Sequence, residues 1–298
     1  YSWLPVAERG LAQGINFSGS RLGAALALPL IAWMIDTLGW RESFFVLGGV
    51  GFAWAVFWFY WFRDEPTDHP SISEEERELI LRERQQPREE EADAPRLTAG
   101  AVLGSRNMWL AMGQYVCSNF TFFFAITWSL PHLKRTYELT GLEAGLYAGV
   151  PLLCGALGNW TSGALVDRIY RGGGWKRSRQ LPAILGFLLA AVGMVLVAAA
   201  DSPLSYCVFL SIAIFGADMT LSPSWAFCID IGRRNAGAVS GTMNMAGNLG
   251  ALVTALAFAY LEEWTDSTTP YFLTAAVLNL LAVAAWLATR PDRPLEEW

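Results

Sequence analysis

Histidine and cysteine, the residues that most often build metal sites, are scarce in this chain of 298 residues. There are two histidines and four cysteines, and the cysteines are widely spaced within apolar stretches without any CxxC pair. This spacing is typical of small core residues and argues against a disulfide framework. We therefore expect no metal ion, and no sequence motif indicates a cofactor.

Charged residues are also few: they make up 16% of the chain, whereas a typical soluble domain has about 25%. The net charge is −6 and no basic stripe is present that could neutralise phosphates, so nucleic acid is not an expected partner. The chain also lacks the HExxH, GxSxG and paired-aspartate patterns of a membrane-embedded enzyme. An enzyme is therefore only a remote alternative.

Long apolar blocks dominate the sequence, since 53% of the residues are hydrophobic and they are concentrated in eight segments. A helix needs roughly 20 apolar residues to cross the hydrocarbon core of a bilayer, where each backbone N–H and C=O must be bonded within the segment. The pattern therefore predicts an all-α protein embedded in a lipid bilayer. The expected spans are Leu11–Ile35, Ser43–Phe62, Met108–Leu130, Leu142–Val166, Leu181–Ala200, Leu204–Ile229, Ala236–Leu261 and Tyr271–Ala288.

Most Lys and Arg residues lie in segments on the same side of the predicted membrane. An even number of spans puts both ends of the chain on the same side of the membrane. Of the 21 Lys and Arg residues, 17 fall in segments on that side and 3 on the other. Because cytoplasmic loops are enriched in Lys and Arg, we expect both ends of the chain in the cytoplasm.

A long charged segment divides the spans into two and six. It indicates three parts: residues 1–62 with two spans, a cytoplasmic linker at 63–107, and a six-helix part at 108–298. Within the linker, Ser73 and Glu76 have the spacing of a capping box and predict the start of a short helix. Glycine pairs at small-xxx-small spacing favour close helix packing in lipid. They are Gly10/Gly14, Gly19/Gly23, Gly145/Gly149 and Gly237/Gly241.

Several short strings follow one another along nearly the whole chain. They are PVAERG at 5–10 with GINFSGSRLG at 14–23, GWR at 39–41, DEP at 64–66 with SEEE at 73–76, GALVDR at 163–168, and SPSW at 222–225. In this order and spacing they resemble the major facilitator superfamily. Within it they are similar to the anion:cation symporter family, which includes sugar-acid, hexuronate and aromatic-acid transporters.

This resemblance implies a major facilitator-type helical bundle whose eight transmembrane helices correspond to helices 5–12 of the family. It also implies that the first four helices of the fold are missing, so that the chain is N-terminally truncated. The implied function is secondary active transport of a small organic anion, such as a sugar acid, coupled to H⁺ across the cell (inner or plasma) membrane. The alternative is a truncated non-transporting fragment, or a half-module that needs a partner.

Asp218 is the one carboxylate deep within a span, where ionisable groups are costly and mark functional sites. With Ser222 and Trp225 it falls at i, i+4 and i+7, on one face of a helix. A hydroxyl, an aromatic surface and a carboxylate suit a proton-coupled carrier of sugar acids. The resemblance implies that Ser222 and Trp225 line the substrate site. Asp218 is either a proton site or a structural carboxylate paired with a neighbouring helix.

Two other spans offer polar side chains on one face. Asn244 and Asn248 are four residues apart, and an amide suits the hydroxyl and carboxylate groups of a sugar acid. Asn244 is the preferred substrate contact, while Asn248 either binds substrate or bonds to another helix. Tyr115 and Asn119 share a face with Gln114 beside it. Their span corresponds to helix seven of the family, which lines the central cavity.

The first span and the loop signature complete the candidate residues. Asn16 and Arg21 lie in the span that corresponds to helix five, and relatives often have Asn where this chain has Arg21. Arg21 either pairs bidentately with a substrate carboxylate or pairs with acidic residues of the missing helices. Gly163, Asp167 and Arg168 match the loop signature of the superfamily. We interpret Asp167 and Arg168 as a gating latch whose charges pair across the two halves.

Overall fold

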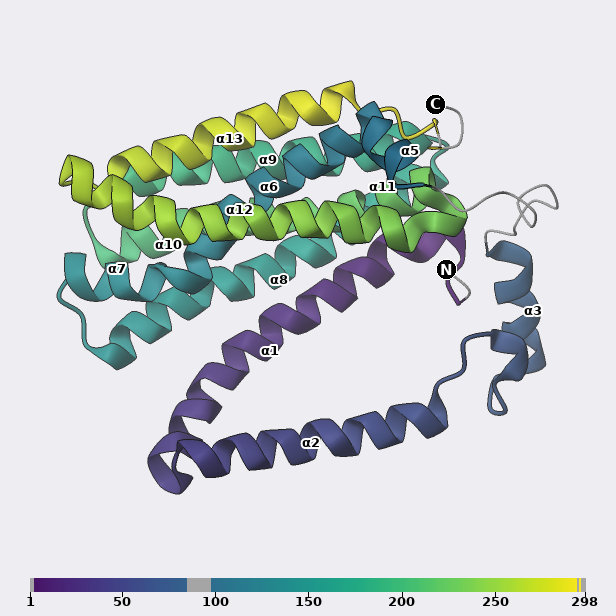
Figure 1. Cartoon of the computed structure of the whole chain (residues 1–298), viewed down its shortest axis with the longest axis horizontal. Helices are drawn as coiled ribbons and strands as arrows, with labels where there is room; N and C mark the ends of the chain where they lie inside the picture. Colours follow the sequence, from purple (N-terminus) through teal and green to yellow (C-terminus); the bar gives the residue numbers. More distant parts are fainter. Residues whose placement is uncertain (1–2, 85–97, 294, 296–298) are drawn as a thin grey trace.

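The computed structural model describes residues 3–84, 98–293 and 295, and this part of the chain is helical without any strand. Long helices run side by side in a bundle, with α1 and α2 along one side of it (Figure 1). The helices are α1 Arg9–Leu38, α2 Trp40–Trp61, α3 Glu74–Glu83, α5 Ala99–Gly104, α6 Arg106–Thr127, α7 Ser129–Thr136, α8 Gly141–Arg171, α9 Trp175–Ala198, α10 Pro203–Met219, α11 Leu221–Gly232, α12 Ala236–Thr265 and α13 Thr269–Ala288.

Each expected span coincides with one long helix, except that Leu204–Ile229 covers α10 and α11 and Met108–Leu130 runs from α6 into the first residues of α7. Among the described residues, five helical stretches are long and apolar enough to cross a membrane. They are Trp40–Trp61, Trp175–Ala198, Pro203–Gly232, Ala236–Thr265 and Thr269–Ala288. The other three expected spans lie in α1, α6 and α8, which have 30, 22 and 31 residues and carry polar side chains within their apolar stretches. The prediction of an all-α membrane architecture is confirmed.

One span is broken into α10 and α11 at Thr220. Pro223 has no backbone N–H, so the carbonyl of Met219 loses its helical donor. The hydroxyl of Ser162, on α8, donates to that carbonyl instead. The hydroxyl of Thr220 is itself hydrogen-bonded to Ser118 of α6 at 3.0 Å. Side chains of two neighbouring helices thus stabilise a break at a depth where unbonded backbone groups would be costly.

Large buried side chains hold the helices of the six-span part together. Around Phe124, the rings of Tyr271 and Phe272 lie with centroids 5.2 and 5.1 Å away. A second cluster contains Trp286 and Phe227, whose ring centroids are 5.6 Å apart. Because lipid is as apolar as these side chains, close packing of this kind is a main source of cohesion between membrane helices.

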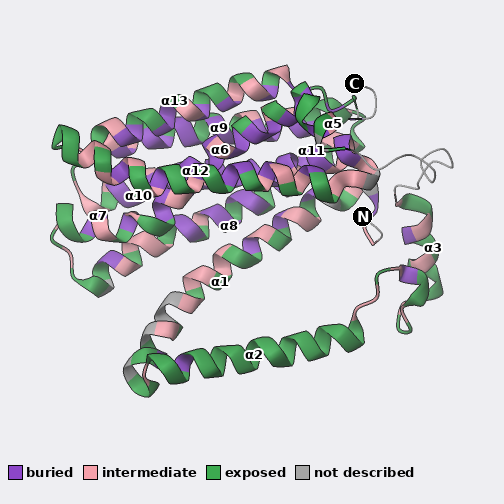
Figure 2. Ribbon diagram, in the orientation of Figure 1, coloured by how far each residue is buried: buried purple, intermediate pink, exposed green. Residues whose placement is uncertain are grey.

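The first two helices differ sharply in how they contact this bundle. α1 packs closely on α8: a Cβ at Gly163 would lie 2.6 Å from the carbonyl oxygen of Gly10, so the two backbones meet only because glycine is present. Within α2, by contrast, Ser43 alone is buried, and apolar residues such as Phe45 and Phe59 are exposed (Figure 2). Most of the apolar surface of α2 is therefore not covered by any described helix.

The predicted short helix of the linker is present as α3. The hydroxyl of Ser73 accepts a hydrogen bond from the N–H of Glu76 at 3.2 Å, and α3 runs from Glu74 to Glu83. Arg84, which follows it, pairs with Glu65 at 2.6 Å. Residues 85–97 of the predicted linker lie outside the described residues.

Candidate functional site

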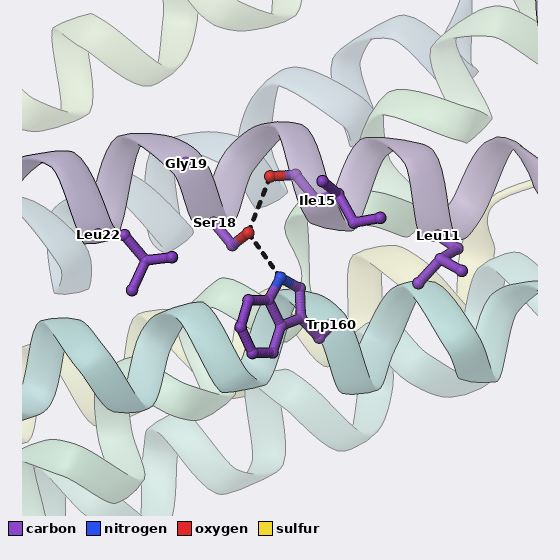
Figure 3. A pocket seen from close by; sticks show the side chains of 6 residues that line it. All are labelled: Leu11, Ile15, Ser18, Gly19, Leu22 and Trp160. Atoms are coloured by element: carbon purple, nitrogen blue, oxygen red, sulfur yellow. Dashed lines mark hydrogen bonds between the residues drawn. The ribbon is translucent and has the colours of Figure 1, made fainter.

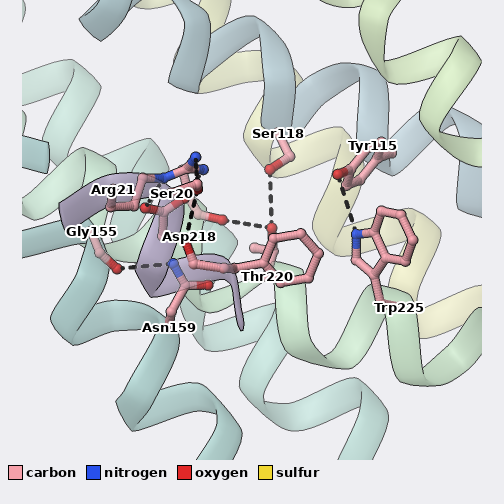
Figure 4. Close-up of polar contacts among 11 residues, drawn as sticks. Ser20, Arg21, Tyr115, Ser118, Gly155, Asn159, Asp218, Thr220 and Trp225 are labelled. Carbon is pink, nitrogen blue, oxygen red and sulfur yellow. Dashed lines mark hydrogen bonds and ion pairs between the residues drawn. The ribbon is translucent and has the colours of Figure 1, made fainter. Parts of the chain in front are cut away.

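Asp218 and Arg21 form a buried ion pair just before the break between α10 and α11. Nε of Arg21 donates to Oδ2 of Asp218 at 2.8 Å, and Nη2 donates to Oδ1 at 2.6 Å (Figure 4). The side chain of Asp218 is 1% exposed and that of Arg21 is 13% exposed. A charge-assisted contact with two bonds fixes orientation as well as distance. It joins α1 to α10, and therefore links the two-span part to the six-span part.

Two other helices, α6 and α8, meet around this pair. The guanidinium carbon of Arg21 lies 3.5 Å from the ring centroid of Phe122 on α6, a cation–π contact. Nη1 of Arg21 also donates to the hydroxyl of Ser20 on α1, at 3.2 Å. On the opposite side, Oδ2 of Asp218 packs against Gly155 of α8 so closely that a Cβ at this glycine would overlap it. The ion pair is thus confined where α1, α6, α8 and α10 converge.

Trp225, near the middle of α11, belongs to a small aromatic group. Its Nε1 donates to the hydroxyl of Tyr115 on α6 at 3.3 Å, and its ring centroid lies 5.3 Å from that of Phe17 on α1 (Figure 4). Trp225 is half-buried and Tyr115 is buried. The structure therefore brings together two predicted site residues, Tyr115 and Trp225, from helices that are far apart in the sequence.

Ser222 lies between Asp218 and Trp225 in sequence and faces the backbone of α1. Its Oγ is buried and makes no hydrogen bond to any described residue. A Cβ at Gly14 would lie 3.4 Å from this oxygen. A buried hydroxyl without a partner is costly, so Ser222 is a candidate for binding a polar group.

Gln114 and Asn119, predicted to lie beside the site, are both buried between helices. Oε1 of Gln114 accepts from the indole of Trp286 and from the hydroxyl of Ser224, each at 3.3 Å. The amide of Asn119 lies against α12, where a Cβ at Gly247 would come within 2.5 Å of its Nδ2. Both amides therefore contribute to helix packing in this conformation.

The other three predicted amides lie on open faces of the bundle. Asn16 on α1 and Asn248 on α12 are exposed, and Asn244 is partly exposed. Nδ2 of Asn248 donates to the carbonyl of Asn244 at 2.9 Å, so Asn248 bonds within its own helix. Polar side chains at membrane depth normally face protein or a water-filled cavity, which indicates that these faces are not exposed to lipid.

Asp167 connects α8 to the beginning of α1. Its two carboxylate oxygens accept hydrogen bonds from the backbone N–H groups of Gly10 and Leu11, both at 2.8 Å. The first turn of a helix has unbonded N–H groups and a partial positive charge, so a carboxylate is favourable there. Of the two residues predicted as a latch, Asp167 thus contacts α1 and Arg168 is exposed, while Gly163 of the same signature packs against Gly10 of α1.

The structure also contains buried polar residues that the sequence analysis does not identify. Arg179 of α9 pairs with Asp230 of α11, with Nε and Oδ2 2.7 Å apart and the side chains 1% and 6% exposed. Asn159 of α8 donates from Nδ2 to the carbonyl of Gly155, while its buried Oδ1 makes no hydrogen bond to any described residue. Both residues of the ion pair lie just outside the predicted spans, so an ionisable residue within an apolar span was not available as a signal. No comparable signal marks Asn159.

A shallow groove between α1 and α8 has an apolar lining, unlike the polar contacts described above. It is lined by Leu11, Ile15, Ser18, Gly19, Leu22 and Trp160 (Figure 3). Its polar atoms are already bonded, because Trp160 Nε1 donates to Ser18 Oγ at 2.6 Å and this hydroxyl donates to the carbonyl of Ile15 at 2.8 Å. A lining of this kind offers nothing to balance the charge of an anion.

The fold and the buried contacts define a class of protein. It is a multi-pass α-helical membrane protein in which ionic and aromatic side chains from a two-span and a six-span part meet halfway along the α10–α11 span. The chain belongs to the Major Facilitator Superfamily, whose sequence profile matches residues 1–255. The predicted superfamily is thereby confirmed.

Three transporters are similar in sequence to this chain over most of its length. The chain is 30% identical to the probable sulfoacetate transporter SauU of Cupriavidus necator over 288 residues, which are 95% of this chain and 65% of that protein. It is 30% identical to the probable galactarate/D-glucarate transporter GarP of Escherichia coli K12 over 297 residues, with 96% and 66% covered. A D-galactonate transporter of Escherichia coli O6:H1 is 30% identical over 272 residues, with 88% and 62% covered. The chain therefore spans slightly less than two thirds of the length of these relatives.

Proposed function

We propose that this chain forms the larger part of a secondary active transporter that moves a small organic anion together with H⁺ and is not an enzyme. The Arg21–Asp218 pair carries this proposal. It combines a guanidinium that fits an acidic group with a carboxylate that can accept a proton, both within the membrane-spanning bundle. The relatives support substrates with a carboxylate or sulfonate, because they are named for sulfoacetate, galactarate, D-glucarate and D-galactonate.

Each predicted site residue has a role in this proposal. Arg21 binds the acidic group of the substrate, and Asp218 takes up the coupled proton. Trp225 and Tyr115 provide an aromatic surface for the carbon chain of the substrate. Hydroxyl groups are bound by Asn16, Asn244, Asn248 and Ser222, while Gln114 and Asn119 position α6 against its neighbours.

We further propose that four more helices of the same fold complete the path of the substrate. The exposed apolar surface of α2 and the exposed amides of Asn16 and Asn248 support this, because both kinds of surface favour a protein neighbour. A Cβ would meet no atom within 4 Å at several glycines of the predicted packing pairs, so a further helix could approach closely there. These glycines are Gly19, Gly23, Gly237 and Gly241.

Transport would proceed by alternating access. The linker at 63–107 joins the half that ends at residue 62 to the half at 108–298, and the two halves rock about the central site. The distribution of Lys and Arg supports an orientation in the cell membrane with both ends of this chain in the cytoplasm. In that orientation, the bonds from Asp167 to the start of α1 close the cytoplasmic side, with Gly163 permitting the close approach and Arg168 at the rim.

Uptake into proteoliposomes tests the proposal. The gene product is purified as the cell makes it, reconstituted, and supplied with labelled sulfoacetate, D-glucarate or D-galactonate under an inward proton gradient. We expect at least one anion to accumulate and the accumulation to stop when the gradient is collapsed. Trp225→Ala should lower uptake by about tenfold or more through loss of aromatic contact. Trp264→Ala, at an exposed position of α12, is the matched control. Absence of uptake for all three anions would overturn the proposal.

A half-module that needs a partner chain is the second candidate, and the uncovered surface of α2 favours it. The intact mass of the protein purified from its own membrane separates the two candidates. A mass above 32.8 kDa by about four spans supports the single-chain transporter. A mass near 32.8 kDa supports the half-module, and co-purification would then identify the partner.

A further inference from the structure

All three nitrogen atoms of the Arg21 guanidinium contact an oxygen in this structure. Nε and Nη2 donate to the two oxygens of Asp218, and Nη1 donates to Ser20. The ring of Phe122 covers one face of the guanidinium. A substrate carboxylate that binds with two parallel hydrogen bonds needs two neighbouring N–H groups of the guanidinium, such as those of Nε and Nη2 that donate to Asp218. A substrate that binds Arg21 in this way would have to displace Asp218.

We propose that the carboxylate of Asp218 occupies the binding position of the substrate's acidic group. It pairs with Arg21 until the substrate displaces it. This inference rests on the proposed function and adds a property to it: Asp218 lowers the apparent affinity for the anion. If Arg21 is free in only a fraction of the molecules, the apparent affinity falls by that fraction. Because the pair joins α1 to α10, its exchange for substrate also releases a contact between the two parts of the chain.

The surroundings of Asp218 provide an acceptor for its protonated form. Oδ2 of Asp218 packs against Gly155, and the carbonyl of this glycine accepts a hydrogen bond from Nδ2 of Asn159, one turn further along α8 (Figure 4). Oδ1 of Asn159 is buried and unbonded to any described residue. An amide oxygen can accept the O–H of a carboxylic acid, whereas it repels a carboxylate. We therefore assign Asn159 as a positioning residue that holds Asp218 once it is protonated.

Few charged or titratable groups reach Asp218 from the elements packed around it. Among the described residues these are the guanidinium of Arg21 from α1 and the phenol of Tyr115 from α6. α8 contributes the backbone of Gly155 and the neutral amide of Asn159. If substrate takes Arg21, the carboxylate of Asp218 becomes a buried charge without a partner, which is costly. Uptake of one proton removes this cost, so the anion and H⁺ bind together.

Equilibrium binding of D-glucarate and sulfoacetate to the complete reconstituted protein tests the inference. Asp218→Asn should bind about tenfold more tightly than wild type at neutral pH, because Arg21 is free. Arg21→Gln should lose most of the binding, and the double variant should bind as weakly as Arg21→Gln. Asp230→Asn makes the same chemical change in the other buried pair, and its affinity should equal that of wild type. Asn159→Leu should flatten the dependence of affinity on pH.

The outcomes distinguish this inference from the proposed function. If wild type binds these anions and Asp218→Asn binds them no more tightly, Asp218 is a structural brace and the inference alone is wrong. If wild type binds neither anion in this assay and takes up none of the three in the uptake assay, the proposed function fails and the inference falls with it. If Asp218→Asn does not fold, the wild-type affinity between about pH 8 and about pH 5.5 decides, since both anions stay ionised there. Rising affinity as the pH falls supports the inference, and a flat or opposite trend overturns it.

Discussion

Two arginine–aspartate pairs are buried in the described part of the chain, and they differ in what they connect. Arg21–Asp218 links α1 to α10, across the linker, whereas Arg179–Asp230 links α9 to α11 within the six-span part. In both pairs Nε donates to Oδ2, at 2.8 and 2.7 Å. Similar contacts therefore occur once between the two-span and six-span parts, which the proposed mechanism requires to separate, and once within the six-span part.

The two pairs also differ in how many residues donate to the aspartate. The indole of Trp175 donates to the same Oδ2 of Asp230 at 3.2 Å, and the guanidinium carbon of Arg179 lies 5.5 Å from the ring centroid of Tyr170. The carboxylate of Asp218, in contrast, accepts side-chain hydrogen bonds from Arg21 alone among the described residues. A carboxylate with several donors is suited to holding two helices, while one with a single donor residue is suited to exchange.

Swapping the arginine and the aspartate within each pair is the change from which we expect the largest effects on stability and anion binding. Arg21→Asp alone should destabilise the fold by about 3–5 kcal/mol because it leaves Asp218 without its partner. Adding Asp218→Arg should restore most of the stability, yet move the guanidinium to α10 and weaken anion binding by about tenfold or more. The corresponding exchange of Arg179 and Asp230 should retain both properties.

Thermal unfolding in detergent and anion binding measure the two properties separately. The uptake probes D-glucarate and sulfoacetate serve as ligands for both exchanged proteins. Anion binding at the wild-type level in the exchanged Arg21/Asp218 protein would show that the position of the guanidinium is unimportant. The distinction between the two pairs would then be lost.

Gly155→Ala should produce a smaller effect of the same kind. The added Cβ would overlap Oδ2 of Asp218, and overpacking of this sort costs about 1–3 kcal/mol. Displacing the carboxylate from Arg21 should also raise the affinity for the anion, though less than Asp218→Asn does. Gly145→Ala on the same helix meets no atom within 4 Å and is the matched control. Lower anion affinity in a folded Gly155→Ala protein would contradict the idea that Asp218 competes with the substrate.

The helices of this protein could be predicted from sequence because apolar residues occur in blocks of membrane-spanning length. The expected span Leu142–Val166 lies within α8, and Tyr271–Ala288 matches α13 almost residue for residue. The linker helix followed from Ser73 and Glu76, since a cap depends on neighbours in the sequence. The break at Thr220 was not predicted: Pro223 lies three residues after it, but Pro151 and Pro182 are accommodated within α8 and α9 without a break.

The contacts of the candidate site could not be predicted in the same way. The pairing of Arg21 with Asp218 depends on how α1 and α10 align across 197 residues. Gln114 lies beside the predicted face of Tyr115 and Asn119, but Trp286 and Ser224, from two other helices, donate to its amide oxygen. Periodicity assigns a residue to a face of its helix, whereas the neighbour of that face is set by packing of the whole bundle. The roles of these residues in transport therefore stay predictions.

The smallest expected effect is on the pH dependence of stability and comes from His132. Unlike the two aspartates, this buried ionisable residue lies among aromatic rings. It belongs to α7, is 5% exposed, and has the rings of Tyr206, Phe258 and Phe272 at centroid distances of 5.1, 6.0 and 5.9 Å. Burial lowers the pKa of His132 from 6.5 to about 4. The unfolded chain therefore binds a proton at His132 at a higher pH than the folded protein does, and stability falls as the pH decreases from about 6.5 to about 4.

At about pH 5.5 this loss should be about 1 kcal/mol relative to neutral pH. His132→Phe keeps an aromatic ring in place and should remove that part of the pH dependence, as measured by thermal unfolding in detergent at the two pH values. His69→Gln, in the segment after α2, should leave the dependence unchanged. An equal pH slope in wild type and His132→Phe would mean that His132 is not the group responsible.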